Sequence, residues 1–112
     1  MKINLLYFDG CPFWQQALTN LRTAITEEKL DASVQLIKVT TDQEAVDHRF
    51  LGSPSFQVEG VDFWPTHEDR FSMSCRIYAT SNGLKGWPTV DMLRQKLREK
   101  AHLEESAMPQ SG

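Results

Sequence analysis

Cysteine is scarce in this chain: Cys11 and Cys75 are the only two among 112 residues. Small secreted domains held together by disulfides carry more, so the disulfide-dense class of protein is excluded. In a reducing compartment, two such cysteines are either free thiols or a pair that forms a disulfide transiently. The question for function is therefore whether one or both of them react.

Long apolar runs and an excess of positive charge are also missing. No run approaches the ~20 apolar residues of a membrane span, and the formal net charge of -3 gives no sign of nucleic-acid or anionic-membrane binding. The first four residues lack the apolar region and cleavage site of a signal peptide. We expect a cytoplasmic protein with no nucleic-acid and no membrane partner.

The most informative stretch runs from residue 5 to residue 14, Leu-Leu-Tyr-Phe-Asp-Gly-Cys-Pro-Phe-Trp. Its apolar first half predicts a buried strand that ends at Asp9 and Gly10. Pro12 suits the first position of a helix, which places Cys11 at or next to the helix N-cap and leaves it partly exposed. The positive end of a helix favours an anion and lowers the pKa of a thiol there, so Cys11 is a candidate nucleophile. Asp9 counts against this, because a nearby carboxylate disfavours a thiolate.

Hydrophobic periodicity and turn residues divide the chain into seven elements. A capping box at residues 41–44 marks the start of the second helix. The order β-α-β-α-β-β-α predicts one α/β domain over residues 1–103, with a mixed four-stranded sheet flanked by helices, and a flexible tail at 104–112. The path of residues 61–74 stays open. Strands are expected at residues 3–8, 34–39, 55–60 and 75–79, and helices at 12–29, from 41 to about 51, and at 89–103.

Two motifs resemble the thioredoxin superfamily: Gly-Cys-Pro-Phe-Trp at residues 10–14 and Gly-Ser-Pro-Ser at residues 52–55. The resemblance covers residues 2 to about 103. More narrowly, the chain resembles small bacterial thioredoxin-like proteins, some of them labelled as relatives of alkylmercury lyase. The resemblance implies a thioredoxin-like fold, Cys11 as the nucleophile, and Pro54 as a cis-proline that faces it.

Four residues are candidates for positioning the substrate. Ser53 and Pro54 would offer a free backbone edge to an extended substrate. Pro12 lies next to the cysteine, and Trp14 is expected mainly as a core or rim aromatic packed against the loop that bears Pro54, where it would also shape the pocket. Trp14 also marks a departure, because it stands where a Cys-x-x-Cys turn has its second cysteine.

The missing second cysteine leaves the resolving thiol open. It is a small thiol such as glutathione, a cysteine of a partner protein, or Cys75. A disulfide needs Cα atoms within ~7 Å. The strand expected at 75–79 starts at the end of the sheet remote from Cys11, so Cys75 is the less favoured choice.

We therefore predict a thiol oxidoreductase that acts through Cys11 on a disulfide- or thiol-containing protein or a small thiol, without a cofactor. One alternative is a thioredoxin-fold binding module without turnover. Another is the handling of a thiophilic metal such as mercury or arsenic through Cys11 and Cys75. No metal site is predicted at residues 67–69, His-Glu-Asp, because they lack the spacing of a zinc motif. The oligomeric state stays open.

Overall fold

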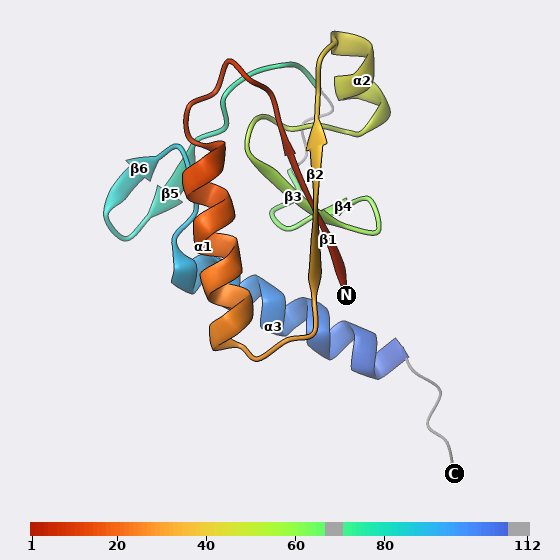
Figure 1. Ribbon diagram of the computed structural model, residues 1–112, viewed down its shortest axis with the longest axis vertical. Coiled ribbons are helices and arrows are strands. Elements are labelled where there is room, and N and C mark those ends of the chain that lie inside the picture. The colour runs from red at the N-terminus through yellow and green to blue at the C-terminus, as the bar shows by residue number, and fades with distance from the viewer. Residues whose placement is uncertain (67–70, 108–112) are drawn as a thin grey trace.

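The computed structural model describes residues 1–66 and 71–107 (Figure 1). Its centre is a four-stranded sheet in the order β2-β1-β3-β4. Strand β1 (Lys2–Tyr7) runs parallel to β2 (Ser33–Lys38) and antiparallel to β3 (Ser55–Val58), which pairs antiparallel with β4 (Val61–Asp62). The expected mixed four-stranded sheet is confirmed.

Helices cover both faces of this sheet. Ile3 and Leu5 of β1 belong to a core cluster with buried residues of α1 (Trp14–Glu27) and α3 (Val90–Ala107). Leu6, the next residue, belongs to a second cluster that includes Ala45 of α2 (Asp42–Asp47). Successive side chains of a strand point to opposite faces, so a strand covered on both sides is apolar throughout. This is why β1 is recognisable in the sequence.

The fourth strand of the sheet is not the one expected at residues 75–79. It is β4, which follows β3 directly through Glu59 and Gly60, both with positive φ (54° and 78°). Two consecutive positive φ values are typical of the tightest hairpin turns. The strands β5 (Tyr78–Thr80) and β6 (Gly83–Lys85) form a separate hairpin. Cys75 therefore lies outside both sheets.

The helix ends also differ in part from expectation. The helix α1 begins at Trp14, with Phe13 as its N-cap, rather than at Pro12. The capping box of α2 is confirmed, because the Thr41 side chain accepts a hydrogen bond from the Glu44 N–H. Helix α3 continues to Ala107, so residues 104–107 are helical and not part of a tail; residues 108–112 lie outside the described residues. Among the described residues, no helix is long and apolar enough to cross a membrane.

One carboxylate joins the C-terminal end of α1 to the first half of α3. Glu28, directly after α1, accepts hydrogen bonds from Arg94 at 2.8 Å and from Arg98 at 2.9 Å. These two hydrogen bonds, Arg98 first, lower the pKa of Glu28 below its ordinary value of 4.5. A carboxylate with a lowered folded-state pKa stabilises the fold above its unfolded pKa, and the contribution is lost as the pH falls through the folded value.

We expect Glu28→Gln to reduce the loss of stability on acidification. Urea denaturation at neutral pH and at a pH below 4.5 should show a smaller difference for the variant than for the wild-type chain, because the variant has no carboxylate to protonate. Arg22→Gln, on an exposed part of α1, is the control and should keep the wild-type difference. An unchanged pH dependence in Glu28→Gln would contradict the role given to this carboxylate.

Candidate functional site

Cys11 lies in the tight connection between β1 and α1. Its backbone N–H donates to the Phe8 carbonyl at 3.2 Å, which closes the turn over Asp9 and Gly10. Its side chain is buried, with 1% of the residue exposed. Two predictions are therefore wrong. Cys11 is buried rather than partly exposed, and it lies two residues before the N-cap, Phe13, rather than at or next to it.

Ser53 connects Cys11 to two other segments. Its carbonyl accepts the Cys11 thiol at 3.4 Å and the Arg76 N–H at 2.9 Å. Its own N–H donates to the Ser74 carbonyl at 2.7 Å, and its hydroxyl oxygen accepts the Phe8 N–H at 3.3 Å. Ser53 is fully buried, and these contacts fix the end of β1, the Cys11 thiol and residues 74–76 relative to one another.

The Ser53–Pro54 peptide bond is cis, the geometry that the resemblance implies. Pro54 is buried, and its carbonyl accepts the Tyr78 hydroxyl at 2.6 Å. The predicted free backbone edge at Ser53 is wrong, because residues 74–76 pair with it as a parallel bridge. The protein's own chain occupies the place expected for a substrate.

Cys75, at the centre of that bridge, lies beside Cys11. It is exposed, whereas Cys11 is buried. Partial loss of solvation raises the pKa of the Cys75 thiol although the residue is exposed, and the neighbouring Cys11 thiol raises it further through hydrogen bonding and charge. The predicted remoteness of Cys75 is therefore wrong. Because the sheet ends at β4, Cys75 is not part of it and pairs with Ser53 instead.

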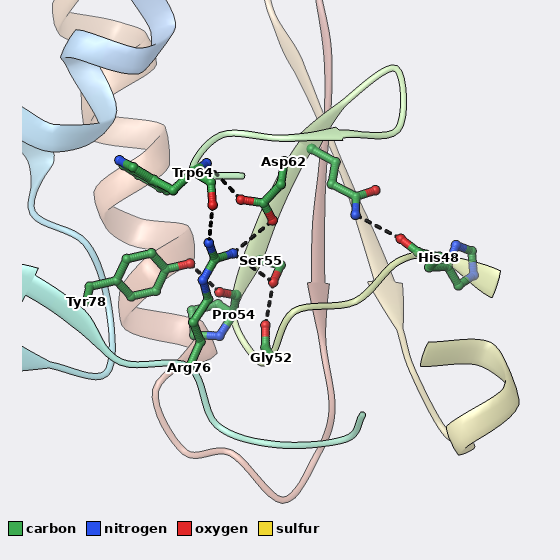
Figure 2. A network of polar contacts seen from close by, with 9 residues as sticks. His48, Gly52, Pro54, Ser55, Asp62, Trp64, Arg76 and Tyr78 are labelled. Atoms are coloured by element: carbon green, nitrogen blue, oxygen red, sulfur yellow. Dashed lines mark hydrogen bonds and ion pairs between the residues drawn. The ribbon is translucent and has the colours of Figure 1, made fainter. Parts of the chain in front are cut away.

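A buried ion pair holds the residue after Cys75 (Figure 2). The Arg76 guanidinium contacts the Asp62 carboxylate at 2.8 Å, and the two side chains are only 10% and 6% exposed. It also donates to the Trp64 carbonyl at 2.7 Å and to the Ser55 hydroxyl at 3.3 Å. These contacts attach the 74–76 segment to β3, β4 and the residues just after β4.

Two further residues shape this attachment. Tyr78 lies under the guanidinium, with its ring centroid 5.1 Å away, and burial raises the pKa of its hydroxyl, which keeps the hydroxyl a proton donor. Gly52 has φ +124°, and a Cβ there would lie 3.0 Å from the Arg76 Cβ. Sequence reasoning missed Asp62, Arg76, Tyr78 and this role of Gly52. The only signal was Asp62 itself, a carboxylate within an apolar stretch.

The other predicted site residues lie around Cys11 without a polar contact to it. Pro12 is exposed in the connection. Trp14 stacks on Tyr7, with ring centroids 4.2 Å apart, so its main contact is with β1. Asp9 pairs with Lys38 at 2.5 Å on the exposed side, and its carboxylate is engaged there.

A cavity of about 660 Å³ lies elsewhere, between α2 and the β3–β4 hairpin, and neither cysteine lines it. Within residues 1–66 and 71–107, no group of three or more His, Cys, Asp or Glu could hold a metal ion. Three of the residues considered in the sequence for such a site, 67–69, lie outside the described residues. The reactive groups that the structure brings together are the two thiols. The cavity is lined by Val46, Arg49, Leu51, Gln57, Gly60, Val61, Asp62, Pro65, Thr66 and Phe71.

Comparisons with protein-family models, with curated proteins and with solved structures gave no match to this chain. The thioredoxin resemblance therefore stays a prediction from the residues. What can be said of function depends on the geometry of Cys11, Ser53, Pro54 and Cys75.

We expect Arg76→Met to destabilise the protein by about 3–5 kcal/mol, because the substitution leaves the buried Asp62 carboxylate without its cation. Urea denaturation measures the change. The double variant Arg76→Met, Asp62→Leu should recover most of it, since no unpaired charge then remains buried. Arg22→Met, on the surface of α1, is the control and should shift stability by no more than about 0.5 kcal/mol. A small effect of Arg76→Met would show that the ion pair does not hold this region.

Gly52→Ala should destabilise the fold by about 1–3 kcal/mol, because an L side chain is strained at this φ, and should also displace residues 75 and 76. Gly60→Ala is the matched control, since Gly60 has a positive φ but open space around it. Alkylation of Cys11 should become faster in Gly52→Ala and stay at the wild-type rate in Gly60→Ala. Equal Cys11 reactivity in both variants would argue against close packing of Gly52 on Arg76.

Proposed function

We propose that this protein is a thioredoxin-like thiol–disulfide oxidoreductase whose redox pair is Cys11 and Cys75. The architecture supports the class: a β2-β1-β3-β4 mixed sheet has helices on both faces, and a cis-proline follows the residue that binds the cysteine thiol. The motifs at residues 10–14 and 52–55, which contain these same residues, are those that resemble the thioredoxin superfamily. The proposed substrate is a disulfide of a partner protein or of a small thiol.

One observation carries the proposal: the only two cysteines of the chain are neighbours in space although they are far apart in sequence, because Ser53 pairs with Cys75 as a bridge and its carbonyl accepts the Cys11 thiol. Two thiols held side by side form a disulfide by losing two electrons and two protons, and a substrate disulfide that accepts them becomes two thiols. Cys75 thus supplies the second sulfur that Trp14 cannot. An external thiol returns the pair to its reduced form.

We expect mild oxidation to produce an intramolecular Cys11–Cys75 disulfide. Incubation in glutathione redox buffers, followed by acid quenching, alkylation and peptide mass mapping, should show both cysteines protected together, at a midpoint independent of protein concentration. The reduced wild-type chain should reduce a model disulfide such as oxidised glutathione. Both Cys11→Ser and Cys75→Ser should lose that full turnover.

Two results would overturn the proposal. One is a folded chain that stays dithiol across the whole redox range. The other is a disulfide that forms only between two copies of the chain. Either would favour the alternative of a binding module that keeps the fold without turnover.

The paired thiols also favour a second candidate function, the binding of a soft metal ion by two thiolates. Titration of the reduced protein with Hg²⁺ would then show one tightly bound ion per chain, with affinity lost in either serine variant. Metal binding without reversible disulfide formation would select this function over the first.

A further inference from the structure

We infer that Cys75 is the sulfur that attacks the substrate and that the buried Cys11 is the resolving sulfur, an assignment that rests on the proposed oxidoreductase function. It reverses the order that the resemblance implies, in which the cysteine before the first helix attacks. Three observations of the described residues carry it. They concern exposure, the backbone edge beside Pro54, and the attachment of residue 76.

The first observation is the difference in exposure between the two sulfurs. An attacking thiolate must reach a substrate sulfur in line with the disulfide bond that breaks. Only 1% of Cys11 is exposed, whereas Cys75 is an exposed residue. Ile77, two residues further on, is 68% exposed and offers a substrate apolar contact on the same segment.

The second observation is that residues 74–76 already occupy the backbone edge through which a substrate would reach Cys11. A substrate that paired with the backbone of Ser53 would present its sulfur to Cys11. Both of the backbone groups that it needs are used, the Ser53 N–H by the Ser74 carbonyl and the Ser53 carbonyl by the Arg76 N–H. The sulfur that those bonds bring to Cys11 is that of Cys75.

The third observation is that buried contacts of the Arg76 side chain hold residues 74–76 in this position. The Arg76 side chain is held by Asp62, Ser55 and the Trp64 carbonyl, and it is 10% exposed. Removing the segment to admit a substrate would break this set of charge-assisted hydrogen bonds, which are stronger than hydrogen bonds between neutral groups. Reaction at the exposed Cys75 leaves them intact.

The reaction then proceeds in two exchanges. Cys75 releases its proton to water, a step that its raised pKa makes less favourable at neutral pH and that a higher pH favours, and its thiolate attacks one sulfur of the substrate disulfide. A Cys75–substrate disulfide forms, the substrate S–S bond breaks, and the first thiolate leaves and takes a proton from water. The Cys11 sulfur attacks the Cys75 sulfur, the Cys75–substrate S–S bond breaks as the Cys11–Cys75 disulfide forms, and the proton of the Cys11 thiol passes to the second substrate thiolate, which leaves as a thiol. An external thiol reductant then supplies the two electrons that restore the dithiol.

Trapping distinguishes the two orders of attack. Reduced Cys11→Ser, Cys75→Ser and wild-type protein are incubated with oxidised glutathione, and the adducts are followed by mass spectrometry. Cys11→Ser should accumulate a stable glutathione adduct on Cys75. Folded Cys75→Ser should be modified at Cys11 at least about tenfold more slowly, because a buried thiol reacts only after local opening. In urea the two rates should converge.

A second measurement uses the unaltered chain. Brief treatment of the reduced wild-type protein with limiting iodoacetamide, followed by peptide mapping, should place the first alkyl group on Cys75. Faster modification of Cys11 in both experiments would overturn the assignment and leave the redox pair in place. If the wild-type chain forms no internal disulfide under oxidation, the proposed function itself fails, whichever cysteine is alkylated first.

Discussion

Two backbone hydrogen bonds between Ser53 and residues 74–76 determine what this site can do. They place a segment from the second half of the chain against the loop that holds Cys11, and so bring the two sulfurs together. Backbone bonds of this kind contribute only about 0.5–1.5 kcal/mol each. Something else must therefore fix the segment firmly, and the side chain of Arg76 is well placed to do so.

Burial of a guanidinium is costly unless its partners are supplied in good geometry. Three partners are supplied here. Asp62 of β4 provides its carboxylate, Trp64 just after β4 provides its carbonyl, and Ser55 of β3 provides its hydroxyl. This explains why so short a strand matters. Its two residues add little to the sheet, but they place Asp62 where the charge of Arg76 needs it.

Much of the fold could be predicted because periodic burial leaves a periodic sequence. Strand β1, covered on both faces, and α1, with one face on the sheet, are examples, and the capping box at Thr41 and Glu44 marked α2. The two-residue β4 has no period to detect. Without this strand, the sequence pattern predicts Cys75 in a strand of the sheet, far from Cys11.

Part of the candidate site could likewise be predicted from the sequence, and part could not. Local sequence placed Cys11 in a turn between a strand and a helix, whereas the cis geometry of Pro54 was implied only by the family resemblance. The partner of Cys11 depends on the pairing of residues 74–76 with Ser53 and on an ion pair between residues 62 and 76, and no local pattern encodes either. A contact of this range is formed by tertiary packing, so it is visible only when the chain is folded.

The long separation of the two cysteines changes how their chemistry is linked to the fold. In a Cys-x-x-Cys turn, both sulfurs lie within one helical turn, and the disulfide closes a very short loop. A disulfide between Cys11 and Cys75 would enclose α1, β2, α2, β3 and β4. The chain-entropy model gives such a loop a stabilisation of about 4 kcal/mol. Folding and oxidation would then favour each other, because the fold holds the sulfurs together and the bond restricts the unfolded chain.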